Sequence, residues 1–211
     1  DSDFKRLMAP SLALLTLAAL TPEPIEVYIE DENVQKINFD DSPDMVGITV
    51  NIDTAYRAFN IAKIYREKNI PVIFGGIYPS AKPEESLKHA TSICIGEAEE
   101  LWGIILSDLQ NNTLKTIYYN DKPTQLINVP IPQRNAINKD DYLYTNIICT
   151  SRGCPFKCDF CYNSCDFTHN SFRNRPIKNV IAEIESLNTK HIMFIDDNFI
   201  GNTEWTKDFL T

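Results

Sequence analysis

The sequence predicts an α/β protein built around parallel strands. Short runs rich in β-branched and apolar residues, such as 45–50 and 71–76, alternate with stretches whose apolar side chains recur at helical spacing. The strand–helix–strand unit at 45–76 has the length of a crossover connection, which joins parallel strands by a helix on the face of the sheet. This alternation occurs twice, on either side of the aperiodic stretch 120–140, so we expect two α/β units.

The elements of the first unit follow in order. Residues 11–20 predict a helix, and IEVYIED at 25–31 alternates apolar and polar residues as a strand does. Asp53 or Thr54 can cap the helix that follows the first buried strand. Further strands are expected at 45–50, 71–76 and 91–97, and helices at 54–69 and 98–110.

The second unit repeats the pattern more briefly. A strand is expected at 145–151, a helix at 177–187 and a strand at 191–196. The resulting division is a first domain at 1–120, a linker at 121–144 and a second domain at 145–211.

Composition excludes several classes of protein. The 211 residues carry a net charge of −9, which argues against electrostatic attraction to nucleic acid or anionic lipid. The apolar run 7–20 is too short to span a bilayer, so we expect no integral membrane segment. Four of the six cysteines lie within 154–165, which favours metal ligands in a reducing compartment over a disulfide framework. These features predict a cytoplasmic protein.

In parallel α/β sheets, ligands bind beyond the carboxyl ends of the strands. Here those ends carry Thr49 and Asn51, the pair Gly75–Gly76, and Gly96–Glu97. Adjacent glycines let the backbone approach a ligand closely. The alternative interpretation is ordinary strand-to-helix turn chemistry, which the same residues also suit.

Cys154, Cys158 and Cys161 follow the expected strand at 145–151 with the spacing C-x3-C-x2-C. Three thiolates from one short loop suit a single soft metal site. Zinc is one candidate, with Cys165 or His169 as a fourth ligand. An iron–sulfur cube is the other; three cysteines leave one of its irons open, which implies catalysis.

The segment SRGCPFKCDFCYN, with Phe160 just before the last cysteine, resembles radical S-adenosylmethionine enzymes. FIDDNFIGN at 194–202 resembles the subgroup that carries an N-terminal cobalamin-binding domain, the class B methyltransferases. PSLALLTLAALTPE, DMVGITV, VIFGGIYPSAKPEESL and ICIGEAEELW resemble that domain, in that order. The resemblance implies a Rossmann-like (flavodoxin-like) cobalamin-binding domain followed by the first β/α units of a partial (β/α) barrel. The chain is then expected to be a fragment whose first strand precedes Asp1.

The resemblance also implies a cofactor site. Cys154, Cys158 and Cys161 would hold a [4Fe–4S] cluster, whose open iron chelates S-adenosylmethionine. An external donor's electron would then cleave this ligand to a 5′-deoxyadenosyl radical. Three further residues are expected at the bound S-adenosylmethionine: Phe160 near the adenine, and Asp196 and Asp197 at its polar groups. The alternative for both carboxylates is a helix N-cap.

Two arginines precede the helix expected at 177–187. Arg173 and Arg175 either line the site or are solvated charges, and we favour the second reading. Cys94 and Cys149 lie inside expected strands and are interpreted as core residues.

In the first domain, the resemblance assigns seven residues to the loops that face the corrin. They are Thr49, Asn51, Gly75, Gly76, Ser80, Gly96 and Glu97. The chain lacks the Asp-x-His-x-x-Gly motif that supplies a histidine to cobalt in many cobalamin domains, so cobalt would lack that ligand here.

The implied function is methyl transfer to an unactivated carbon of a small-molecule substrate, with methylcobalamin as the donor. A radical cyclase or rearrangement enzyme, and a noncatalytic iron–sulfur or zinc protein, are the alternatives. Neither the substrate nor a catalytic residue is indicated by the sequence.

Overall fold

The computed structural model describes residues 7–211, and the strand expected before Asp1 lies outside them. The chain divides into two compact units. The first, here called the sheet unit, comprises Leu20–Glu26 and Ile37–Thr124. The second, the cysteine unit, comprises the described residues up to Ala19 together with Val27–Lys36 and Gln125–Thr211.

We expected residues 1–120 to form one domain, whereas the structure groups two early segments with the cysteine unit. Long-range hydrogen bonds account for this grouping. Leu15 of helix α1 (Leu12–Leu20) accepts a backbone hydrogen bond from Gln133, and the hydroxyl of Tyr142 donates to Asp31 at 3.2 Å. These contacts join segments more than 100 residues apart, which local sequence patterns do not reveal.

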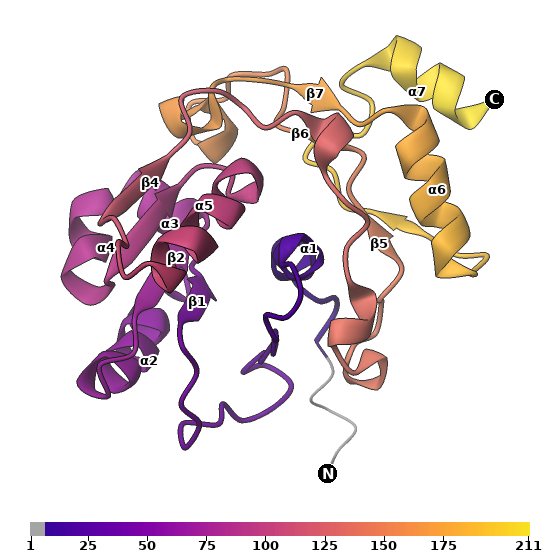
Figure 1. Cartoon of the computed structure of the whole chain (residues 1–211). Helices are drawn as coiled ribbons and strands as arrows, with labels where there is room; N and C mark the ends of the chain where they lie inside the picture. Colours follow the sequence, from indigo (N-terminus) through magenta and orange to yellow (C-terminus); the bar gives the residue numbers. More distant parts are fainter. Residues whose placement is uncertain (1–6) are drawn as a thin grey trace. The chain divides into compact units, whose positions relative to one another are not determined.

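The sheet unit contains a four-stranded parallel sheet in the order β1-β2-β3-β4 (Figure 1). The strands are β1 (Val46–Thr49), β2 (Val72–Gly75), β3 (Ser92–Ile95) and β4 (Ile117–Tyr119). The helices are α2 (Ala55–Glu67), α3 (Ile77–Ala81), α4 (Pro83–His89) and α5 (Glu99–Gln110). The predicted α/β class with a parallel sheet is confirmed, and β4 is an addition to the prediction.

Alternating side chains of the strands build a core on each face of the sheet. Val72 and Phe74 pack with residues of α2, including Phe59, whose ring stacks on Phe74 with centroids 5.9 Å apart. Ile73, between them, points to the opposite face and packs with Ile105 of α5. Successive side chains alternate between two faces that are both covered by helices. Nearly every residue of these strands is therefore apolar.

The cysteine unit contains shorter strands. Strands β5 (Ile147–Ile148) and β8 (Met193–Phe194) pair in parallel, while β6 (Ser151–Arg152) and β7 (Arg173–Asn174) pair antiparallel. Its longer helices are α6 (Ile177–Leu187) and α7 (Thr203–Leu210). The strand predicted at 145–151 is therefore split between β5 and β6, because its two ends pair with different partners.

The strand predicted at 25–31 is wrong: Pro22 and Pro24 interrupt the chain just before it, and no described strand pairs with it. Ile29 instead lines a small hollow together with Leu15 and Tyr142. The expected linker at 121–144 contains three short 3-10 helices, at Leu126–Asn128, Arg134–Ala136 and Lys139–Asp141.

Across residues 7–211, no helix has both the length and the apolar character that crossing a membrane requires.

Candidate functional site

The cysteine loop, residues 153–165, begins directly after β6. Gly153 has a φ of +79°, and a Cβ on it would lie 2.1 Å from the carbonyl oxygen of Ser171. Only glycine fits this close approach of two backbone segments. The turn at Gly153 thus sets the direction in which the chain enters the loop.

The three predicted ligands lie on this loop. Cys154 and Cys161 are half-buried, Cys158 is exposed, and none of them is in a disulfide. The amide of Cys161 donates to the carbonyl of Cys158 at 3.0 Å, which closes a tight turn. Within residues 7–211, no three His, Cys, Asp or Glu side chains converge as a metal site. The donor set itself, three free thiols within eight positions, fits a thiophilic metal cluster.

The cysteine loop contacts the segment that follows β8 at two points. The Tyr162 hydroxyl donates to the Asp197 carboxylate, with both oxygens at 3.0 Å. The Asn198 side-chain amide donates to the Cys154 sulfur at 3.7 Å. Burial, and then the charge of Asp197, raise the pKa of the Tyr162 hydroxyl, so it stays a proton donor at neutral pH. The loop is therefore held at the carboxyl end of β8.

Asp196, one residue earlier, bonds Ser151, which begins β6, and the preceding Thr150. Its Oδ1 accepts from the Thr150 amide at 2.9 Å, the Thr150 hydroxyl at 2.8 Å and the Ser151 hydroxyl at 2.5 Å. Its Oδ2 is buried and has no hydrogen-bond partner among the described residues. The N-cap alternative is wrong for both carboxylates, because Asn202 caps α7 by accepting from the Trp205 amide at 3.1 Å.

Phe160, expected near the adenine of the cofactor, projects from the cysteine loop and is 94% exposed. Exposure on this scale is unusual for a phenylalanine and leaves the ring available for stacking.

Arg175 was expected to be solvated, and this expectation is wrong. Its side chain is 8% exposed and its Nη1 lies 2.6 Å from Glu183 Oε2. Glu183 is fully buried and also bonds Arg134 Nη2 at 2.5 Å. We call these three residues the buried ionic trio. One signal for it was present in the sequence: Glu183 lies three residues after Val180 and four before Leu187, on the apolar side of the predicted helix.

In the sheet unit, the structure brings together the loops that follow β1, β2 and β3. The Ser80 hydroxyl donates to the Gly76 carbonyl at 2.8 Å and accepts from the Gly96 amide at 2.9 Å. Thr49 is paired in register with Gly75 on the neighbouring strand. Five of the predicted residues therefore lie together at the carboxyl end of the strands.

The other two predicted residues of the sheet unit are placed differently. Glu97 accepts a hydrogen bond from the Thr124 amide at 2.8 Å, so its carboxylate holds the end of this unit. Asn51 is exposed, and its amide donates to the Thr54 hydroxyl at 3.0 Å. Thr54 is the N-cap residue that precedes α2, but its side chain makes no capping hydrogen bond to the helix.

The two cysteines outside the loop are shielded from solvent. Burial raises the pKa of the Cys94 thiol to about 12 and that of Cys149 to about 11. Cys94 packs in the core under α5, and the Cys149 thiol donates to the Ser151 carbonyl at 2.8 Å. The raised pKa values keep both thiols protonated at neutral pH.

Comparison with known proteins finds relatives in sequence and in fold. No protein-family model matches the chain. The sequence is 38% identical over 192 residues to bacteriochlorophyllide d C-8(2)-methyltransferase of Chlorobaculum tepidum. That alignment covers 88% of this chain and 42% of the relative. The chain thus spans less than half the length of that relative.

Two solved structures share the fold over nearly all of the chain. One is the cobalamin-dependent S-adenosylmethionine radical enzyme OxsB with aqua-cobalamin bound, with a TM-score of 0.69, 20% identity and coverage of 95% of this chain and 33% of OxsB. The other is the radical S-adenosylmethionine methyltransferase TsrM from Kitasatospora setae with cobalamin and a [4Fe–4S] cluster bound. Its TM-score is 0.69 at 18% identity, over 96% of this chain and 49% of TsrM. The chain is therefore similar in sequence to a named methyltransferase and has the α/β fold found in part of two radical S-adenosylmethionine proteins.

Proposed function

We propose that the protein is a radical S-adenosylmethionine enzyme with a cobalamin-binding domain, which transfers a methyl group to an unactivated carbon of a small molecule. Cys154, Cys158 and Cys161 hold a [4Fe–4S] cluster in this proposal. The sheet unit binds cobalamin. When bound, a reduced cluster of this kind supplies the electron for reductive cleavage of S-adenosylmethionine.

The position of the cysteine loop carries the proposal. The loop lies at the carboxyl end of parallel strands, where α/β enzymes place their chemistry. The Tyr162–Asp197 and Asn198–Cys154 hydrogen bonds join it to the end of β8. A thiolate-bound iron would thus have carboxylates beside it in the segment that follows β8.

The chain's own side chains have separable roles toward S-adenosylmethionine. Three thiols occupy three irons and leave the fourth open to an exogenous ligand. The exposed Asp197 carboxylate suits the ligand's ammonium and ribose hydroxyl groups, and Asp196 Oδ2, buried without a partner among the described residues, is a second acceptor. Phe160 offers an exposed ring to the adenine.

The carboxyl edge of the sheet unit supports the cobalamin part of the proposal. Gly76 and Gly96 both have positive φ angles, and the Ser80 hydroxyl ties their loops together. A backbone without side chains at these turns allows a large ring to approach the edge of the sheet closely. Thr49, Asn51, Gly75 and Glu97 complete the proposed contact set.

The test is anaerobic reconstitution with iron and sulfide. The wild-type chain is expected to gain a broad absorbance near roughly 400 nm, typical of thiolate-bound iron–sulfur clusters. Cys154→Ala is expected to abolish it, while Cys165→Ala, four residues beyond the last ligand, keeps it. An altered EPR signal of the reduced cluster on adding S-adenosylmethionine would support an open iron. Stoichiometric zinc without iron would contradict the proposal and favour a metal that only braces the fold.

Cobalamin is tested separately. Corrin absorbance that co-elutes with the protein on gel filtration supports the assignment of the sheet unit. A chain that takes up iron fully but retains no corrin would remove the cobalamin part of the proposal and leave the radical chemistry standing.

A further inference from the structure

We propose that Glu183 is a positioning residue for the cysteine loop. Through Arg134 and Arg175 it fixes the backbone of residues 147–149, from which the loop departs. This inference deepens the proposed function. Its spectroscopic consequence rests on that function, whereas the role of Glu183 in the metal-free chain does not.

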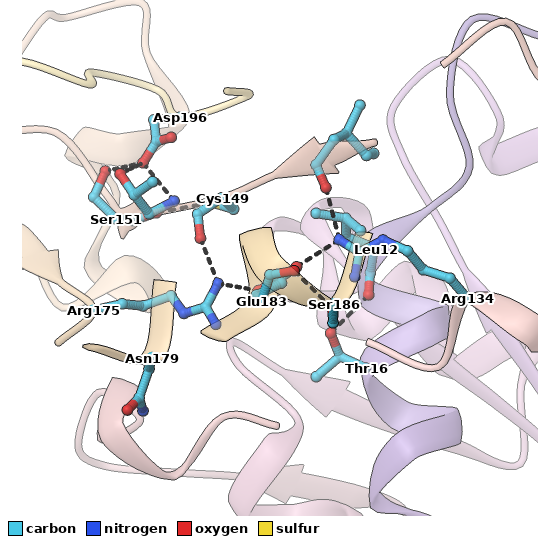
Figure 2. Close-up of polar contacts among 12 residues, drawn as sticks. Leu12, Thr16, Arg134, Cys149, Ser151, Arg175, Asn179, Glu183, Ser186 and Asp196 are labelled. Atoms are coloured by element: carbon cyan, nitrogen blue, oxygen red, sulfur yellow. Dashed lines mark hydrogen bonds and ion pairs between the residues drawn. The ribbon is translucent and has the colours of Figure 1, made fainter. Parts of the chain in front are cut away.

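The buried ionic trio donates hydrogen bonds to two backbone carbonyl groups (Figure 2). Arg134 Nη2, bonded to Glu183 Oε1, also donates to the carbonyl of Ile147 at 2.7 Å. Arg175 Nη1, bonded to Glu183 Oε2, also donates to the carbonyl of Cys149 at 3.0 Å. One carboxylate therefore orients two guanidinium groups, and each guanidinium holds one carbonyl of the strand segment.

The residues just beyond are held from the other side. The amide of Thr150 and the hydroxyls of Thr150 and Ser151 all bond Asp196 at the end of β8, as Figure 2 shows for Ser151. The Arg175 amide donates to the Thr150 carbonyl at 2.8 Å. Residues 147, 149, 150 and 151 are thus each held by at least one of these side chains or by the Arg175 amide, and Cys154 follows three residues later.

Stability alone does not account for an ionic trio in this place. Arg134 and Arg175 are each 7% exposed and Glu183 is 0% exposed, so all three charges are desolvated and their sum is +1. Four further guanidinium nitrogens, Nε and Nη1 of Arg134 and Nε and Nη2 of Arg175, are buried without a partner in the described chain. Well-packed apolar residues are often as stable as a buried ion pair. Apolar side chains cannot, however, hold two carbonyl oxygens by charge-assisted hydrogen bonds.

The primary test is made on the metal-free chain. Glu183→Gln keeps the shape of the side chain but removes the charge that both arginines share. We expect hydrogen exchange at the amides of 149–154 to accelerate at least tenfold, and alkylation of Cys154 by iodoacetamide to accelerate with it. Val180→Ala, one turn earlier on α6 and fully buried, is the matched control. It weakens packing of the same helix and is expected to leave both rates near the wild-type values.

A second variant separates positioning from folding. The triple change Arg134→Met, Glu183→Met and Arg175→Met replaces the trio by apolar side chains of similar length. We expect a urea midpoint close to wild type together with the fast exchange of Glu183→Gln. If this triple variant, or Glu183→Gln, shows the exchange and alkylation rates of the Val180→Ala control, the proposal is overturned.

The loaded protein provides the spectroscopic consequence. After reconstitution, Glu183→Gln is expected to broaden the EPR signal of the reduced cluster, whereas Val180→Ala keeps the wild-type line shape. Failure of the wild-type chain to bind iron would overturn the proposed function, while the exchange measurement would still decide the role of Glu183.

Discussion

The two adjacent glycines at the end of β2 differ sharply in what surrounds them. Gly76 has φ +103° and ψ −166°, a region that only glycine populates readily. A Cβ there would lie 3.0 Å from the Val50 carbonyl and 3.2 Å from the Thr49 hydroxyl. A Cβ on Gly75 would meet nothing within 4 Å. The backbone conformation and close neighbours therefore require glycine at position 76, whereas position 75 has room for a Cβ.

Gly76→Ala is expected to destabilise the sheet unit by about 1–3 kcal/mol, the cost of forcing a side chain into this backbone region. Gly75→Ala is the control and is expected to change the free energy of unfolding by less than about 0.5 kcal/mol. Urea denaturation of both variants measures the difference. Equal effects of the two substitutions would disprove the assignment of strain to Gly76.

Cys94 gives the sheet unit a defined pH dependence. Burial, and then the charge of Glu99, raise its pKa to about 12 from the ordinary value of 9.0. The folded state therefore keeps a proton that the unfolded state loses. The stability from this thiol is fully present below about pH 9 and is lost as the pH rises toward 12, by up to about 1.4 kcal/mol per pH unit.

Comparing urea midpoints of wild type and Cys94→Ala at roughly pH 8 and pH 10 tests this linkage. The wild-type chain is expected to lose more stability than the variant over this interval. Parallel pH profiles would show that Cys94 titrates alike in the folded and unfolded states.

At the scale of elements, the short strands of the cysteine unit depend on side-chain hydrogen bonds. Strands β5 and β8 each have only two residues, and their pairing contributes few backbone bonds. Asp196, two residues after β8, adds three hydrogen bonds to Thr150 and Ser151. The Asp196 carboxylate thus adds side-chain hydrogen bonds beyond the short backbone pairing of β5 and β8.

Asp196→Ala is expected to destabilise the cysteine unit by about 1.5–3 kcal/mol, because hydrogen bonds to a charged group are lost and the Thr150 amide is left without its partner. Asp197→Ala removes only the bond from Tyr162 at an exposed position, so its expected cost is about 1 kcal/mol or less. Thermal unfolding of the two variants compares neighbouring carboxylates directly. A larger loss for Asp197→Ala would contradict the contacts described for Asp196.

At the scale of the whole molecule, the sheet unit has its own core on each face of its sheet. Residues of α2 fill one face and residues of α5 the other. The indole of Trp102 donates to the Thr21 hydroxyl at 2.8 Å, so Leu20–Glu26 is tied to the same unit. A unit with two complete core layers satisfies the requirement for independent folding.

A chain of residues 20–124 is therefore expected to fold by itself. Far-UV circular dichroism should show mixed α/β structure, and heating should give a cooperative transition. Ile105→Ala, which removes a fully buried side chain under α5, is expected to lower the free energy of unfolding by about 2–5 kcal/mol. A non-cooperative transition of the unmodified fragment would show that the sheet unit needs the rest of the chain.

Local patterns predicted most elements of the fold. Periodicity located α2, β2, β3, α5 and α6 within a few residues, because each buries a regular set of apolar side chains. The same rule failed at 25–31, where Val27 is exposed and no described strand pairs with the segment. The assignment of metal ligands to the cysteine loop remains a prediction from sequence.

By itself, the sequence determined the α/β class and the position of the cysteine loop after a strand. Spacing along the chain is sufficient for both, since periodicity and loop position are local properties. Only the tertiary structure revealed the buried ionic trio and the partners of Asp196. Arg134 and Glu183 are 49 residues apart, and Asp196 and Thr150 are 46 apart. Whether such charges are solvated or buried depends on which distant segments pack together, and no local pattern records that.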